Sequence, residues 1–234
     1  MRIAAIADLH CGKFSEEDIR MVLEDVADKA DVLLMGGDLT NVGLVSEIKI
    51  LMKVLETIPI PKIAVLGNHD HENNEVVTLA RIMGENDVCV LDCSSCIIDE
   101  VGFVGTKGFC GGFDKMRIQP FGENAIKSFV ETSINETDRL EAAFKEVQTE
   151  KRVAILHYSP IKGTLAGESP ELFPFLGSSL LANVMERHNV AVVFHGHAHH
   201  GAPEGFTRKG IPVHNVCRFV QHRFYNRHYM IYEI

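Results

Sequence analysis

Apolar segments alternate with amphipathic segments through the first third of this chain. The apolar runs are short enough for buried β-strands and cover residues 2–7, 32–35 and 63–66. After each run, apolar positions recur at helical spacing, over residues 16–29, 44–56 and 74–83. This alternation of strand and helix predicts a parallel sheet with right-handed crossovers.

The pattern changes after about residue 86. Short strands separated by turns, typical of a meander, are predicted over residues 88–91, 96–99 and 101–105. A long amphipathic helix is then predicted over residues 123–148. The remaining expected elements are a strand at 153–156, a helix at 177–188, and strands at 190–194, 211–216 and 228–233. Neither a shift in composition nor a repeat divides the sequence, so we expect a single domain over residues 1–234.

Polar blocks follow the predicted strands in a fixed order. They are Asp8-Leu9-His10, Gly36-Gly37-Asp38, Gly67-Asn68-His69-Asp70, the single residue His157, and Gly196-His197-Ala198-His199. Open α/β sheets bind their ligands at the carboxyl ends of strands, where these blocks would lie. In an extended chain, side chains two residues apart point the same way. We therefore expect Asp8 and His10 to reach one ion, and His197 and His199 to repeat that geometry.

The five blocks resemble the motifs of the calcineurin-like metallophosphoesterase family, which are D-x-H, G-D, G-N-H-[DE], H and G-H-x-H. The resemblance extends from Asp8 to His199, which is most of the chain. It implies an α/β fold built as a four-layer αββα sandwich, with two mixed β-sheets flanked by helices. It also implies a dinuclear metal centre.

The family pattern assigns the ligands of two divalent cations. One cation would be bound by Asp8, His10, Asp38 and His199. The other would be bound by Asp38, Asn68, His157 and His197, so that Asp38 bridges the two. Mixed imidazole and oxygen ligands suit Mn, Fe, Zn or Co, and we leave the choice among these metals open.

The same resemblance implies a reaction. A hydroxide that bridges the metals would attack phosphorus in line with the leaving group. His69 would protonate the leaving oxygen, and Asp70 would orient His69. We expect a phosphoesterase, and more specifically a phosphodiesterase. A phosphomonoesterase or nucleotide phosphatase on the same site is an open alternative, and a non-catalytic metal-binding scaffold is a further one that the intact site disfavours.

The substrate is narrowed by one departure from a related branch. Serine/threonine protein phosphatases carry G-D-x-V-D-R-G, in which the arginine helps to bind phosphate, whereas Val42 stands at that position here. The chain is more similar to the small phosphodiesterase-like members, so we expect a small phosphate ester as substrate, with nucleotides among the candidates. Two loops, 105–122 and 160–174, are expected near the metals. Their basic residues would contact substrate anions or be solvated, and are Lys107, Lys115, Arg117 and Lys162.

Charge and composition indicate which partners and which cellular compartment to expect. The formal net charge of −9 disfavours a general nucleic-acid coat, which usually needs a basic surface. Without a long apolar run or a secretory signal, we expect a cytoplasmic protein with no membrane segment and with reduced thiols. Cys93 and Cys96 have the spacing of half a zinc knuckle, but without a second pair they are interpreted as ordinary thiols.

Overall fold

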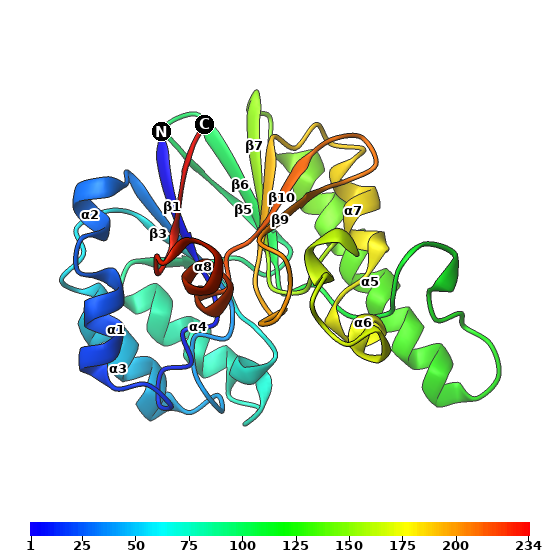
Figure 1. The fold of residues 1–234 in the computed structure, drawn as a ribbon, viewed down its shortest axis with the longest axis horizontal. Coiled ribbons are helices and arrows are strands. Elements are labelled where there is room, and N and C mark those ends of the chain that lie inside the picture. Colours follow the sequence, from blue (N-terminus) through cyan, green and yellow to red (C-terminus); the bar gives the residue numbers. More distant parts are fainter.

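The computed structural model describes residues 1–234 and contains two β-sheets that pack face to face (Figure 1). The first sheet has the strand order β11-β1-β2-β3-β4, and the second has the order β5-β6-β7-β8-β10-β9. Helices cover the outer face of each sheet, so the molecule has four layers (Figure 1). The expected αββα sandwich is confirmed.

Parallel pairing dominates the first sheet. Strand β1 pairs in parallel with β2, β2 with β3, and β3 with β4, while β11 adds an antiparallel edge. The strands are β1 (Arg2–Ile6), β2 (Val32–Gly36), β3 (Lys62–Val65), β4 (Val88–Val90) and β11 (Met230–Glu233). The outer helices of this half are α1 (Glu16–Leu23), α2 (Val26–Lys29), α3 (Val45–Leu55) and α4 (Val76–Glu85).

The second sheet is mixed. Strands β6, β7, β8 and β10 run parallel, and β5 and β9 form antiparallel edges. The strands are β5 (Ser94–Ile98), β6 (Val101–Thr106), β7 (Lys151–Leu156), β8 (Val192–His195), β9 (Glu204–Phe206) and β10 (Pro212–Asn215). The helices after β6 are α5 (Asn124–Glu146), α6 (Phe173–Leu176), α7 (Ser179–Met185) and α8 (Arg218–Tyr225).

Three apolar clusters hold the layers together. One lies between the first sheet and its helices and includes Ile19, Leu33 and Leu51. A second lies between the two sheets and includes Ile3, Phe103 and Phe194. A third joins the second sheet to α5 and α7 through residues such as Phe144 and Leu181. Both faces of each sheet are therefore buried, which explains why the parallel strands are continuous apolar runs.

The structure corrects three predictions from the sequence. The helix expected over residues 16–29 is two helices, α1 and α2. The expected meander is divided between the sheets, because β4 pairs with β3 whereas β5 pairs with β6. Helix α8 was not predicted. It has only eight residues, and several of them are polar or charged, so its apolar periodicity is weak.

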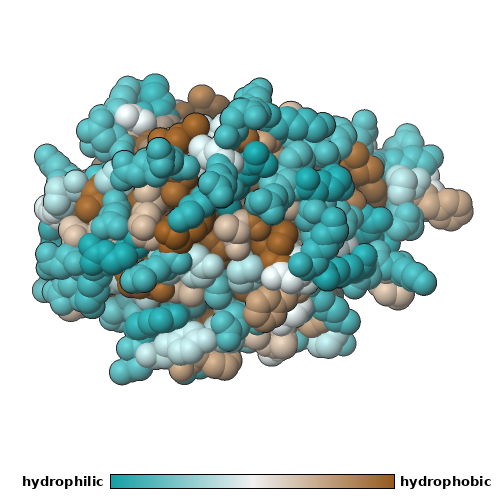
Figure 2. Space-filling model, turned by 90° about the horizontal axis from the view of Figure 1, so that it is seen from above, coloured by the Kyte–Doolittle hydropathy of each residue, from teal (hydrophilic) through white to brown (hydrophobic).

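The surface seen from above is mainly hydrophilic, with small hydrophobic patches separated by polar side chains (Figure 2). Among the helices, none combines the length and the apolar character that crossing a membrane requires.

Candidate metal centre

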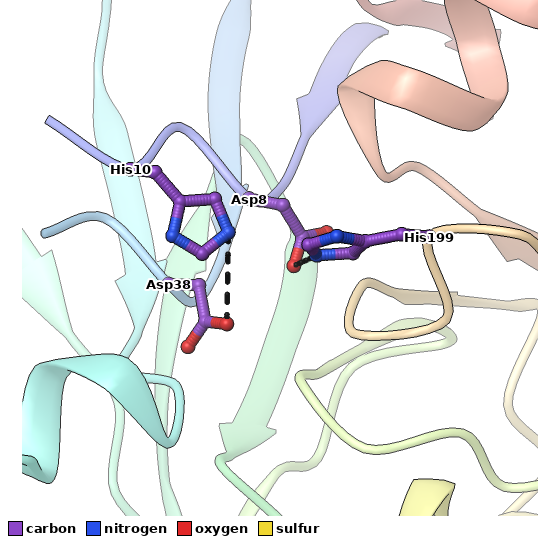
Figure 3. A group of neighbouring side chains, drawn as sticks. All are labelled: Asp8, His10, Asp38 and His199. Carbon is purple, nitrogen blue, oxygen red and sulfur yellow. Dashed lines mark hydrogen bonds and ion pairs between the residues drawn. The ribbon is translucent and has the colours of Figure 1, made fainter. Parts of the chain in front are cut away.

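Four side chains from three strand ends point toward one another in a first cluster (Figure 3). They are Asp8, His10, Asp38 and His199, and their candidate ligand atoms all lie within 4.8 Å of one another. Asp8 and His10 follow β1, Asp38 follows β2, and His199 comes after β8 from the other sheet. The cluster therefore lies where the two sheets meet at the carboxyl ends of their parallel strands.

A second cluster shares Asp38 with the first. Candidate ligand atoms of Asp38, His157 and His197 also lie within 4.8 Å of one another. Asn68, which follows β3, lies next to this group, with its Oδ1 2.9 Å from Nε2 of His157. All seven side chains predicted as ligands are thus brought together around Asp38, in two groups.

The backbone at these residues differs from the extended chain that we expected. Asp8, Asp38 and His197 have φ values of 62°, 50° and 69°, and His10 has 47°. These are left-handed conformations that non-glycine residues rarely adopt. Asp8 and His10 therefore converge on one cluster through left-handed turns beyond the strand end, and not through extended chain. His197 and His199 lie in different clusters, so the expectation that they repeat the geometry of Asp8 and His10 is wrong. Strain of this kind concentrates at functional sites.

Hydrogen bonds to backbone carbonyls orient the histidines of the second cluster. Nδ1 of His157 donates to the carbonyl of Gly36 at 2.9 Å, and its Nε2 faces Oδ1 of Asp38 at 3.2 Å. His197 donates from Nε2 to the carbonyl of Phe175 at 3.3 Å. One nitrogen of each ring is thereby left for a cation, which is the usual arrangement for metal-binding histidines.

His10 provides the test of whether a cation fits the first cluster. Both of its ring nitrogens are buried and have no hydrogen-bond partner in the protein. Its Nε2 lies 4.0 Å from Oδ2 of Asp38, too far for a hydrogen bond. Buried polar atoms are almost always satisfied in folded proteins. A divalent cation between this imidazole and the neighbouring carboxylates would satisfy the ring, so the residues present fit a metal.

The charges of the site favour two carboxylates in their ionised form. Burial alone would raise the pKa of Asp8, but the hydrogen bond from His199 and the nearby histidines hold it well below its usual range. Burial likewise opposes ionisation of Asp38, whose pKa is nonetheless lowered by His157. Burial lowers the pKa of His10 to about 4 and that of His197 to about 3. Burial opposes the charged form of His157 and His199 as well, but the neighbouring carboxylates raise the pKa of His157 to about 9 and also raise that of His199. Because a metal-bound imidazole is neutral, a cation would displace the protons of these two rings.

Gly67 allows the close approach of these side chains. A Cβ atom at this position would lie 2.1 Å from Oδ1 of Asp38 and 2.8 Å from Cε1 of His157. Any larger residue would therefore push the shared carboxylate or the His157 ring out of place. The glycine of the Gly67-Asn68-His69-Asp70 block is required by packing at the centre itself.

The predicted proton donor lies next to the shared carboxylate. Nε2 of His69 is 4.0 Å from Oδ2 of Asp38, and the ring is 41% exposed. Its Nδ1 donates to the carbonyl of Asn41 at 2.6 Å. This contact corrects the expectation that Asp70 orients His69 directly.

Asp70 instead organises the backbone around the site. Its buried carboxylate accepts hydrogen bonds from the amides of Leu39, Thr40 and Gly67 and from the hydroxyl of Thr40. Burial raises the pKa of this carboxyl group. Asp70 therefore ties the loop after β2 to the loop after β3, and these loops carry Asp38 and His69.

Sequence reasoning missed two groups of residues around the centre. One is the Asn41 carbonyl, which no side-chain pattern reveals. The other is α8, whose Phe219 ring lies 5.0 Å from the ring of His199 and 6.3 Å from that of His10. On the same helix, Arg223 donates to the carbonyl of His199 at 2.7 Å. Gln221, also on this helix, is buried.

The basic loop residues and the CxxC cysteines singled out in the sequence lie in different surroundings. Among the four basic loop residues, Lys107 is joined to a predicted ligand, because its carbonyl accepts a hydrogen bond from the amide of His157 at 3.1 Å. Lys115 and Arg117 lie in or beside a 3₁₀ turn before α5, and Lys162 stacks on Phe173. The two cysteines of the CxxC spacing have different partners: Cys93 contacts Thr106, and Cys96 contacts Cys89. The half zinc knuckle is therefore not assembled.

Comparison with known proteins finds relatives over the part of the chain that contains these residues. The family model described as calcineurin-like phosphoesterase matches residues 1–201. A protein of Vesicomyosocius okutanii, described as a probable cyclic nucleotide phosphodiesterase, is 24% identical over 78% of this chain and 67% of its own length.

Solved structures show the same fold at low sequence identity. The phosphopantetheinyl hydrolase of Mycobacterium tuberculosis superposes with a TM-score of 0.69 at 14% identity, covering 98% of this chain and 95% of its own. A Staphylococcus aureus protein described as a candidate 5'-nucleotidase gives a TM-score of 0.53 at 13% identity. The match covers 92% of this chain and 48% of the other.

Proposed function

We propose that this chain, which belongs to the calcineurin-like phosphoesterase family and is a hydrolase that acts on phosphate esters, is a dinuclear phosphodiesterase. The observation that carries the proposal is the position of Asp38, which belongs to both ligand clusters. A carboxylate with two oxygens can bridge two cations at the separation usual in two-metal sites. The similarity to a protein described as a cyclic nucleotide phosphodiesterase supports a diester as the substrate.

Two divalent ions drawn from Mn, Fe, Zn and Co would supply charge to stabilise the phosphoryl oxygens and would activate the attacking water. Asp8, His10, Asp38 and His199 would hold one ion, and Asn68, His157 and His197 would complete the other with Asp38. The centre would admit a small phosphate ester, with nucleotides among the candidates. We also propose that the protein acts in the reducing cytoplasm, as its six free cysteines suit.

His69 is proposed as the catalytic acid. Its Nδ1 is engaged by the Asn41 carbonyl, so its Nε2 is the atom that would give a proton to the leaving oxygen. The 41% exposure of the ring leaves room for a substrate beside it. Asp70 would act as a positioning residue, because its hydrogen bonds set the distance between the loops that carry Asp38 and His69.

The test compares hydrolysis of bis(p-nitrophenyl) phosphate with that of p-nitrophenyl phosphate by the Mn²⁺-loaded protein. We expect faster cleavage of the diester. The His69→Ala variant should lose about 10²- to 10⁴-fold in kcat, the usual contribution of a general acid, while still binding both metals. Metal content is measured in parallel by mass spectrometry.

The outcomes separate the alternatives. Preference for the monoester would replace the diesterase assignment with the phosphomonoesterase or nucleotide phosphatase. Unchanged kcat in His69→Ala would remove this residue from the reaction. No hydrolysis of either ester by protein that holds two metals would leave an enzyme of narrow specificity or the non-catalytic scaffold.

A further inference from the structure

A cavity of about 270 Å³ lies beside the metal centre. It is formed where α4, the ends of β3, β4 and β6, and the middle of α5 come together. We call it the α4 pocket, and its wall includes Leu66, His71, Val77, Ala80, Leu91 and Lys107. These residues lie at the same edge of the sheets as the predicted ligands, the edge where α/β proteins bind their substrates.

The α4 pocket shares its backbone segments with the metal centre. Leu66 precedes Asn68 by two residues, and His71 follows His69 by two. Lys107 accepts the hydrogen bond from the amide of His157. A substrate whose phosphorus lies at the cations can therefore extend one substituent along these segments into the pocket. Pockets that enclose a whole drug-sized ligand measure roughly 300–1,000 Å³, so this smaller cavity suits one arm of a substrate.

The chemistry of the wall specifies the arm. Six of the eleven lining residues are apolar, and all six are aliphatic. No Phe, Tyr or Trp side chain lines the pocket, so a nucleobase would find only the His71 imidazole to stack on, against six aliphatic side chains. Val77, on α4, is 80% exposed, an apolar side chain that nothing in the protein covers. Burying such a surface against an alkyl group would be favourable.

The charged groups at the rim make contacts within the protein. Arg139 donates to Oδ2 of Asp92 at 2.9 Å and lies 3.6 Å from Oε2 of Glu136. Glu136 also accepts from the amide of Gly108 at 3.1 Å. Lys107 donates from Nζ to the carbonyl of Gly108 at 3.1 Å. These contacts engage the charged side chains of the rim, which leaves the aliphatic wall as the main surface open to a ligand.

We propose that the α4 pocket binds an aliphatic substituent of the phosphodiester, and this rests on the function proposed above. The substrate class is a phosphate ester with an extended or branched alkyl arm. The imidazole of His71, which makes no hydrogen bond within the protein, is placed at the pocket to donate to a polar atom carried by that arm.

The first experiment measures kcat/KM for methyl, butyl and hexyl p-nitrophenyl phosphates with the Mn²⁺-loaded protein. We expect kcat/KM to rise with chain length, by roughly fourfold for each methylene that becomes fully buried. Val77→Asp should bring the ratio of the hexyl to the methyl ester toward one. Met21→Asp is the matched control, because Met21 is 54% exposed on α1, away from the pocket, and the ratio should stay as in the wild type.

A wild-type ratio near one, or a ratio that Val77→Asp leaves unchanged, would overturn the pocket assignment while the phosphodiesterase stands. If no ester is hydrolysed, the proposed function fails, and a binding measurement still tests the pocket. Calorimetry with hexyl and methyl phosphate on the metal-loaded protein should then show tighter binding of hexyl phosphate, weakened by Val77→Asp. Equal binding of the two would refute the pocket.

Discussion

The two ligand clusters that share Asp38 are held in different ways. In the second cluster, His157 donates to the carbonyl of Gly36 at 2.9 Å, and His197 donates to that of Phe175 at 3.3 Å. Each of these rings therefore has an orientation before any cation binds. Hydrogen bonds preorganise this half of the centre.

In the first cluster, His199 donates to Asp8 at 3.0 Å, but His10 depends on packing. His10 is buried and makes no hydrogen bond from either ring nitrogen. Aromatic rings surround it instead, with the centroids of His69, His199 and Phe219 at 4.6, 5.4 and 6.3 Å. The comparison teaches that one fold can position equivalent ligands by two means, and it predicts different responses to mutation.

The largest effect is expected from Asp38→Asn, which removes the charge common to both clusters. Both cations should be lost, with affinities reduced by more than the roughly 10- to 100-fold that the loss of an outer-shell partner costs. The measurement is metal content after purification, together with Mn²⁺ titration by calorimetry. Retention of one ion at wild-type affinity would show that Asp38 serves a single cluster.

A smaller effect is expected from Phe219→Ala, which removes the ring beside His10 and His199. Affinity for the ion of the first cluster should fall about tenfold, while the second cluster keeps its ion because its histidines are hydrogen-bonded. Stepwise Mn²⁺ titration checks this.

Phe224→Ala is the matched control for this substitution, since Phe224 lies on the same helix and is 52% exposed. It should leave both affinities unchanged. Equal weakening of both sites by Phe219→Ala would remove the distinction between the clusters.

The smallest effect concerns a buried histidine, His214, that belongs to neither cluster. Burial lowers the pKa of His214, although Glu204, 3.9 Å away, opposes this and Arg227 adds to it. The ring also stacks near Phe194 and Tyr232. Because the unfolded chain would bind a proton at the ordinary pKa of about 6.5 and the folded chain would not, stability should fall as the pH drops below that value.

His214→Phe should reduce this acid sensitivity. Titration of His214 changes the free energy of unfolding by at most about 1.4 kcal/mol per pH unit. Urea unfolding of the metal-free protein at pH 7 and pH 5 measures it, and equal losses in the variant and the wild type would contradict it. The measurement shows what a buried imidazole contributes to stability outside the two clusters.

Strands β1, β2 and β3 and the order of the polar blocks could be predicted from the sequence alone. Each block directly follows an apolar run, and parallel strands end at one edge, so the ligand residues could be expected to meet. Local periodicity contains this information. It also accounts for the long helix α5, expected over residues 123–148 and found at Asn124–Glu146.

The orientation of these residues relative to one another depends on the tertiary structure. The pairing of β4 with β3, the contact of His69 with the Asn41 carbonyl and the packing of Phe219 on His10 all join segments distant in sequence. The left-handed backbone at Asp8 and Asp38 is tolerated by aspartate, but it is fixed by contacts between their segments, such as the hydrogen bond from the amide of Asp8 to the carbonyl of Gly37. Sequence patterns encode which residues lie on one face or at one edge, whereas ring orientation and loop conformation depend on long-range contacts that no local pattern contains.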